Sequence, residues 1–123
     1  MKKKYSLKRN EEIAKIVNKR ICYRNDAFCV YYKGNNQLNY SRVCISVSKK
    51  NGDAVIRNKI KRQIREMVSE IFDFTLSVDY VIVVRFNYQS NNFKENFDKL
   101  EKIYLKINPN KNEERNKWRK KAF

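Results

Sequence analysis

The chain has 123 residues and a net charge of +16, with 29 Lys and Arg against 13 Asp and Glu. This length suits one domain with a modest core, and so large a positive excess favours a polyanionic partner such as nucleic acid. The sequence contains no histidine, which excludes a Ser/His triad, a Cys/His dyad and a histidine general base. No apolar run approaches the roughly 20 residues of a membrane span, so a membrane is not expected as a partner.

Residues 1–9 form a basic arm, which we expect to be ordered only if RNA or the domain holds it. A helix is predicted from Asn10, its expected cap, to about Arg20, with Glu11 and Glu12 in the first turn against the positive end of the helix dipole. One face of this helix carries Ile13, Ile16 and Val17.

Two strands are predicted next. Residues 27–32 are aromatic and β-branched, and residues 39–47 alternate apolar with semi-polar side chains. The first strand places on one face Phe28, Val30 and Tyr32, and on the other Ala27, Cys29 and Tyr31. Turn residues at 34–36 separate the two strands, so we expect an antiparallel hairpin.

A loop over residues 48–53 leads into a basic helix that begins near Val55. Residues 79–86 contain an apolar run typical of a central strand. A final helix has a core stripe of Phe93, Phe97, Leu100, Tyr104 and Ile107, and Pro109 ends it. Residues 110–123 form a basic tail that contains Trp118. The order α-β-β-α-β-α predicts an α+β fold, one domain over residues 1–123 with helices packed on a mostly antiparallel sheet.

The three cysteines, Cys22, Cys29 and Cys44, match no metal-binding spacing. An odd cysteine count and the lack of a recognisable signal peptide favour the cytoplasm, where thiols stay reduced. We therefore expect free or buried thiols and no metal site in the protein.

The helix near Val55 sorts its side chains by chemistry around its axis, at about 100° per residue. An apolar stripe for the core contains Ile56, Ile60, Ile64, Met67 and Ile71. An adjoining polar arc, named here the basic arc, contains Arg57, Asn58, Lys61, Arg62 and Arg65. The acids Glu66 and Glu70 fall on the remaining side with Lys59.

The basic arc has the chemistry of an RNA-binding surface. Arginine offers a planar fork of donors that fits phosphate oxygens, lysine adds a point charge, and Asn58 can reach a phosphate, a 2′-hydroxyl or a base edge. Ordinary solvated faces mix charges of both signs, whereas this arc contains no acid. Asp53 is the expected helix cap, and Lys49 and Lys50 extend the positive surface across the preceding loop. The pattern favours RNA binding over a merely solvated face.

At this helix the sequence resembles the bacterial ribonuclease P protein family. The resemblance rests on the run Ser48-Lys49-Lys50-x-Gly52-x-Ala54-Val55-x-Arg57-Asn58-x-x-Lys61-Arg62-x-x-Arg65-Glu66, and the upstream strands and element order extend it over most of residues 7–107. It implies an α–β sandwich with a four-stranded mixed sheet, like domain 2 of ribosomal protein S5. It also implies a left-handed βαβ crossover, against the usual right-handed rule.

The resemblance further implies a function. The holoenzyme would be an endoribonuclease that removes the 5′ leader from precursor tRNA. Its catalytic RNA subunit would perform the reaction with Mg²⁺, bound mainly by that RNA and the substrate. The protein would be an accessory subunit without catalytic residues or a small-molecule ligand, and it would bind the catalytic RNA through the basic arc, Lys49 and Lys50.

The same family holds the leader in a cleft between the first helix and the sheet. The matching positions here are Ile13, Val17, Phe28 and Tyr31. A base stacked on such a ring contributes about 1–3 kcal/mol. Phe28 could equally be a core residue, and for Tyr31 the cleft role is favoured over a core role. The family commonly has aromatic residues on the first helix, and aliphatic Ile13 and Val17 stack less well on a base.

Two other functions are weighed against this one. A structural RNA-binding protein, such as a ribosomal component, fits the composition but not the motif around Arg57. A protein-only nuclease is disfavoured because the chain has no histidine and no clustered carboxylates for a metal ion.

Overall fold

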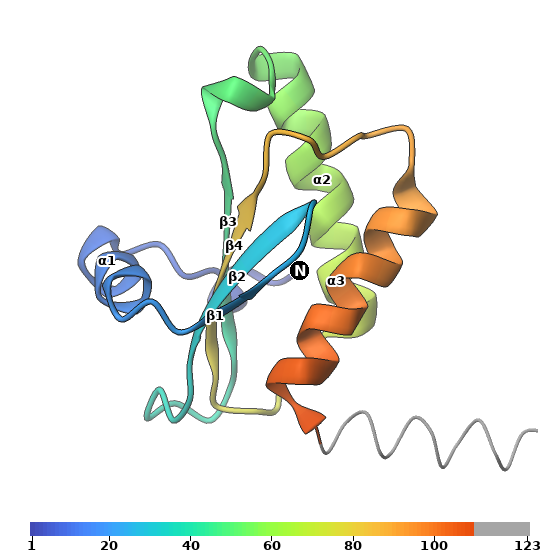
Figure 1. Cartoon of the computed structure of the whole chain (residues 1–123). Helices are drawn as coiled ribbons and strands as arrows, with labels where there is room; N and C mark the ends of the chain where they lie inside the picture. The colour runs from blue at the N-terminus through green and yellow to red at the C-terminus, as the bar shows by residue number, and fades with distance from the viewer. Residues whose placement is uncertain (110–123) are drawn as a thin grey trace, which may run out of the picture.

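The computed structural model describes residues 1–109, and the tail of residues 110–123, with Trp118, lies outside the described residues (Figure 1). Four strands form one sheet in the order β1-β2-β4-β3. Their bounds are β1 (Cys22–Arg24), β2 (Phe28–Lys33), β3 (Arg42–Val47) and β4 (Asp79–Val84). β4 pairs antiparallel with β2 and parallel with β3, so the sheet is mixed.

The predicted hairpin between residues 27–32 and 39–47 is wrong, because β4 lies between β2 and β3. Ile82 of β4 pairs with Val30 of β2 on one side and with Ile45 of β3 on the other. Five of the six β4 residues are buried and the sixth is half-buried, so this strand is suited to the middle of a sheet with both faces covered. A direct pairing of β2 with β3 would leave β4 as an apolar edge strand.

Helices cover both faces of the sheet (Figure 1). α1 (Asn10–Asn18) lies on one face, whereas α2 (Ala54–Ile71) and α3 (Phe93–Ile107) pack against each other on the opposite face. α2 connects the parallel neighbours β3 and β4, which forms a βαβ unit. The α+β class and the mixed four-stranded sheet are therefore confirmed, and the left-handed sense of the crossover stays a prediction.

Two apolar clusters hold the layers together. The larger cluster lies between the sheet and the α2–α3 pair and includes Ile64, Tyr80 and Leu100, none of which is exposed. The smaller one lies under α1 and consists of Leu7, Ile16 and Val81, with half-buried side chains around them. Because fewer buried apolar side chains lie under α1 than under α2 and α3, apolar packing holds α1 less strongly.

The N-terminal arm is held by the domain. A short 3-10 turn at Lys3–Tyr5 precedes Leu7, whose side chain is 3% exposed and whose backbone N–H donates to the carbonyl of Val43 at 3.0 Å. The ring of Tyr5 stacks on Phe74 with centroids 4.3 Å apart. Residues 5–7 therefore belong to the packed structure of the domain.

Some local predictions need correction. Asn10 does not cap α1, because Arg9 occupies the N-cap position and no side chain there accepts a hydrogen bond from the first-turn N–H groups. Ile56, expected in the apolar stripe, is 42% exposed because it lies on the first turn of α2. Val68, which was not part of the predicted stripe, is buried on α2. β1 was not predicted, since three residues are too few for a recognisable alternation.

Candidate nucleic-acid interface

The basic arc of α2 faces outward and lacks acidic partners. Asn58, Arg62 and Arg65 are exposed, and Arg57 and Lys61 are half-buried. Within residues 1–109, no acid forms an ion pair with the arc. The Nε of Arg57 is buried and has no hydrogen-bond acceptor in this part of the chain. The exposed side chains of Asn58, Arg62 and Arg65 are the groups of the arc that can donate to acceptor oxygens of a ligand.

The start of α2 is fixed by its own sequence. The Asp53 carboxylate accepts a hydrogen bond from the N–H of Ile56 at 3.0 Å, so the predicted cap is confirmed. Gly52 has φ 137°, and a Cβ added there would lie 2.9 Å from Cγ2 of Ile56. The loop therefore turns into the helix in a conformation that glycine alone adopts without strain.

The two loop lysines stand beside this fixed turn. Lys49 and Lys50 are exposed in a 3-10 turn (Lys49–Asn51), and the Asn51 amide donates to the carbonyl of Arg85 at 2.9 Å. That bond ties the loop to the end of β4. The lysines thus extend the positive surface of α2 from a loop with a defined position.

The basic arc reaches the edge of the sheet at β3. Lys61 and Arg65 line a hollow of about 150 Å³ together with Leu7 and Cys44, which point to the α1 side of the sheet. Burial raises the pKa of the Cys44 thiol, and the positive charge of Lys61 acts in the opposite direction. The positive surface of α2 is therefore continuous with the face that carries α1.

A second hollow lies on that face and is named here the α1 cleft. It has a volume of about 530 Å³ and is lined by Val17, Asn18, Arg20, Cys22, Arg24 and Tyr31. Of the residues assigned to the leader cleft, Val17 and Tyr31 meet in it, and Ile13 packs on the same small core beside Val17. A side-chain hydrogen bond with Cys29 is the main cause of a raised pKa at Tyr31.

Phe28 does not belong to this cleft. Its side chain has no exposed surface and packs in the larger core, where its ring meets Tyr88 edge to face at 5.6 Å. The correction follows from strand geometry, because Phe28 and Tyr31 are three residues apart on β2 and point to opposite faces. Of the two aromatic positions, Tyr31 alone faces α1.

Two cationic residues of the α1 cleft were missed at the sequence level. Arg20 and Arg24 line it beside Tyr31. Arg24 lies on β1, and Cys22, two residues earlier, pairs with Tyr31 across the strands. Recognition of β1 would have placed Arg24 on the α1 face together with Cys22 by their alternation, whereas Arg20 precedes the strand and carries no such signal. These arginines bring positive charge next to an aromatic ring, the combination that single-stranded nucleic acid uses.

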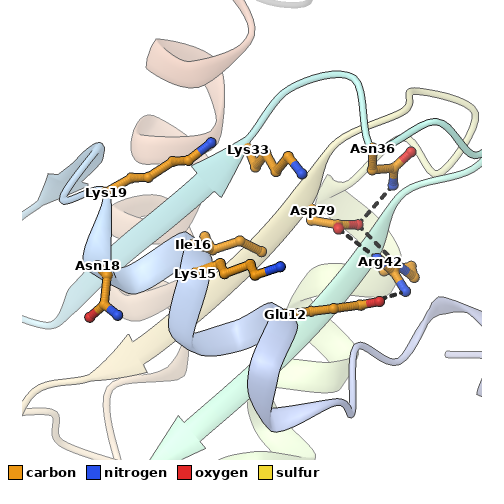
Figure 2. A pocket seen from close by; sticks show the side chains of 9 residues that line it. All are labelled: Glu12, Lys15, Ile16, Asn18, Lys19, Lys33, Asn36, Arg42 and Asp79. Carbon is orange, nitrogen blue, oxygen red and sulfur yellow. Dashed lines mark hydrogen bonds and ion pairs between the residues drawn. The ribbon is translucent and has the colours of Figure 1, made fainter.

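An ion network fixes α1 over the sheet (Figure 2). Asp79 is 3% exposed and accepts two hydrogen bonds from Arg42, at 3.0 and 2.7 Å. Arg42 also forms an ion pair with Glu12 of α1 at 2.9 Å. The hydrogen bond to Asp79 is the main cause of a raised pKa at Arg42. The network thus links the first turn of α1 to the ends of β3 and β4.

The part of the chain that the structure describes holds no group of three His, Cys, Asp or Glu side chains suited to a metal ion. Its three cysteines are unpaired and half-buried, in keeping with the predicted free thiols. Within the same residues no helix has the length and apolar character needed to cross a bilayer.

Comparison with known proteins agrees with this geometry. Residues 1–108 match the family Ribonuclease P. The ribonuclease P protein component of Mesoplasma florum is 42% identical over 109 residues, which cover 87% of this chain and 98% of the relative. The ribonuclease P protein of Staphylococcus aureus has a solved structure that is 34% identical, with a TM-score of 0.68 and coverage of 84% of this chain and 94% of that one.

A more distant structure has the same fold. The Thermotoga maritima ribonuclease P protein, solved with 1-(4-fluorophenyl)-2-thiourea, is 28% identical, with a TM-score of 0.62 and coverage of 82% and 94%. The match to the family spans nearly all of the described residues, and the relatives are covered almost completely. The chain therefore belongs to the bacterial ribonuclease P protein family.

Proposed function

We propose that this chain is the accessory protein subunit of an RNA-catalysed ribonuclease P, which cleaves the 5′ leader from precursor tRNA. The catalytic RNA binds the basic arc together with Lys49 and Lys50. The observation that carries this assignment is the acid-free arc, whose cations form no ion pair within residues 1–109. Phosphate oxygens of the RNA accept hydrogen bonds from the exposed cations of this arc.

The α1 cleft helps to hold the single-stranded leader. Its Tyr31 ring offers a stacking surface, and Arg20 and Arg24 supply charge for phosphates along the same hollow. Ile13 and Val17 add apolar contact in place of a second ring. Mg²⁺ is bound mainly by the RNA subunit and the substrate, where it activates the attacking water, and the protein lowers the Mg²⁺ concentration that the holoenzyme needs.

Reconstitution tests the assignment. The purified protein alone should leave precursor tRNA uncut, and adding it to the cognate catalytic RNA should restore leader removal at low Mg²⁺. A structural ribosomal protein would give no such rescue and would show no preference for precursor over mature tRNA. Failure to rescue at low Mg²⁺ overturns the proposal.

The RNA-binding surface is tested by binding across a salt series. Arg57→Ala, Arg62→Ala and Arg65→Ala should each weaken affinity for the catalytic RNA and lower the slope of log K against log salt by up to about 0.9 per lost phosphate contact. Glu66→Gln and Glu70→Gln are the matched controls on the other side of α2, and they should not weaken binding. Equal losses in the two sets contradict the assignment of the arc.

A further inference from the structure

A group of exposed apolar side chains, named here the apolar tip, lies at the end of the sheet where α2 begins. Val55 and Ile56 in the first turn of α2 are 78% and 42% exposed, and Phe86, which follows β4, is 73% exposed. Isolated apolar side chains are common on protein surfaces. These three, however, are half of the six large apolar side chains that are exposed within residues 1–109.

The strand register places these residues around one loop. β3 and β4 are parallel and their last residues pair, so the chain leaves both strands at the same end of the sheet (Figure 1). The loop after β3 leads into α2, and its Asn51 amide donates to the carbonyl of Arg85, the neighbour of Phe86, at 2.9 Å. The side chain of Ile56 lies against Gly52 of the same loop. Exposed apolar groups gathered in this way mark interaction sites.

The backbone at Phe86 has a fixed position although the side chain is exposed. Phe86 lies in a tight turn, which the N–H of Tyr88 closes by donating to the carbonyl of Arg85 at 3.1 Å. Tyr88 is 7% exposed, and its hydroxyl donates to the side chain of Gln63 on α2 at 2.8 Å. The turn is therefore anchored before and after Phe86, which holds the ring in solvent on an ordered backbone. Such preorganisation lowers the entropic cost of binding.

The charges beside the apolar tip favour a nucleic-acid partner. Lys49 and Lys50 are exposed in the loop, and within residues 1–109 neither forms an ion pair. The acid of this loop, Asp53, is engaged as the helix cap by the N–H of Ile56. Arg57, the first cation of the basic arc, directly follows Ile56, so the two surfaces are continuous. An exposed ring flanked by cations is the combination that binds unpaired bases.

We propose that Phe86 stacks on an unpaired base of the catalytic RNA, with Val55 and Ile56 in apolar contact with the same nucleotide. Lys49 and Lys50 bind phosphates of the flanking nucleotides. This contact rests on the proposed function, because it extends the surface that the basic arc offers to that RNA. The arc binds phosphates, which every RNA has, whereas the ring requires an unpaired nucleotide at a matching place. The apolar tip therefore selects where on the RNA the protein docks.

Filter binding of the full chain to the cognate catalytic RNA, across a salt series, tests the proposal. Phe86→Ala should weaken binding about tenfold, a loss within the range of a base stacked on an aromatic ring. The slope of log K against log salt should not change, because no phosphate contact is lost. Phe86→Tyr should keep the affinity, whereas Phe86→Leu, which is apolar but has no flat ring, should lose about as much as Phe86→Ala. Tyr23→Ala is the matched control, since this aromatic side chain is 38% exposed on β1 at the opposite edge of the sheet. It should leave binding unchanged.

Fluorescence reports the stacking directly. The chain contains one tryptophan, Trp118, so the double variant Phe86→Trp, Trp118→Phe has its only indole at the apolar tip. Addition of the catalytic RNA should quench the emission of this indole and shield it from acrylamide. Emission and acrylamide quenching that do not change when the RNA binds overturn the proposal.

Failure of this inference is distinguishable from failure of the proposed function. If the unchanged protein binds the catalytic RNA and Phe86→Ala binds it equally well, the stacking contact is overturned and the assignment of the basic arc stands. The apolar tip then serves a partner other than this RNA. Equal binding by Phe86→Leu and the unchanged protein indicates an apolar contact that needs no flat ring, which also overturns the stacking. If the unchanged protein does not bind the catalytic RNA, both proposals fall.

Discussion

Replacing Asp79 with asparagine measures how much the ion network under α1 stabilises the fold. The Asp79 carboxylate is 3% exposed and accepts hydrogen bonds from Asn36 at 2.7 Å and from Arg42 at 3.0 and 2.7 Å. Asparagine has nearly the same size but no charge. Its NH₂ group is a donor, and it would face the donors of Asn36 and Arg42. Arg42 is then left with Glu12, whose side chain is 36% exposed.

The magnitude follows from burial. Removing one partner of a buried ion pair costs about 3–5 kcal/mol, since the other charge is left uncompensated. The Arg42 side chain keeps 19% of its surface in solvent, so we expect the lower end, about 3 kcal/mol of the free energy of unfolding. That is a large share of the roughly 5–15 kcal/mol that stabilises a typical domain.

Urea unfolding followed by circular dichroism gives this free energy by linear extrapolation. Asp26→Asn is the matched control, because it breaks the ion pair with Lys99 at 3.0 Å, where the Asp26 side chain is 62% exposed. Solvent screens such a pair, so little or no change is expected. If Asp79→Asn destabilises the protein no more than Asp26→Asn does, the buried network is not a major source of stability.

The α1 cleft, the loop before α2 and the larger core offer three further tests. Val17→Phe adds a ring near Tyr31 and should tighten leader RNA binding about five- to tenfold in a filter-binding titration, the lower end of the ~1–3 kcal/mol of a stacked base. Unchanged affinity would mean that the leader lies elsewhere. Gly52→Ala should lower the free energy of unfolding, measured in urea, by about 1–3 kcal/mol, because φ is 137° and the added Cβ would contact Ile56. A loss below about 0.5 kcal/mol would contradict backbone strain at this position. Burial raises the pKa of Tyr88 to about 12, above the value of about 10 in an unfolded chain. The folded state therefore holds this proton more tightly, so its contribution is complete below pH 10 and is lost as the pH rises towards 12. Tyr88→Phe should make stability fall less steeply over that range, and an equally steep fall would assign the loss to other groups.

Sequence patterns predicted well the features that depend on spacing within a single helix. The stripe Ile60, Ile64, Met67 and Ile71 is buried on α2, and the acid-free arc lies next to it on the outside. Asp53 caps the helix as its position predicts. Each of these features depends on spacing along one helix, where a period of 3.6 residues fixes which side chains share a face.

Strand order depends on competition between distant segments, and here sequence reasoning failed. β2 and β3 are neighbours in sequence with turn residues between them, which favours a hairpin. The stronger constraint is the apolar β4, whose two edges are both paired because an exposed edge would leave its backbone groups open to association. The choice between these pairings is a property of the whole sheet, so no local pattern contains it.

The position of α1 shows why the site was only partly predictable. α1 buries a single side chain, Ile16, so apolar contact alone defines its orientation weakly. The link from Glu12 through Arg42 to Asp79 supplies a directional constraint between residues far apart in sequence. Because the α1 cleft is bounded by this helix, its shape should depend on the same three charges. Asp79→Asn should therefore weaken leader binding even though Asp79 lies outside the α1 cleft, while binding of the catalytic RNA to the basic arc stays unchanged.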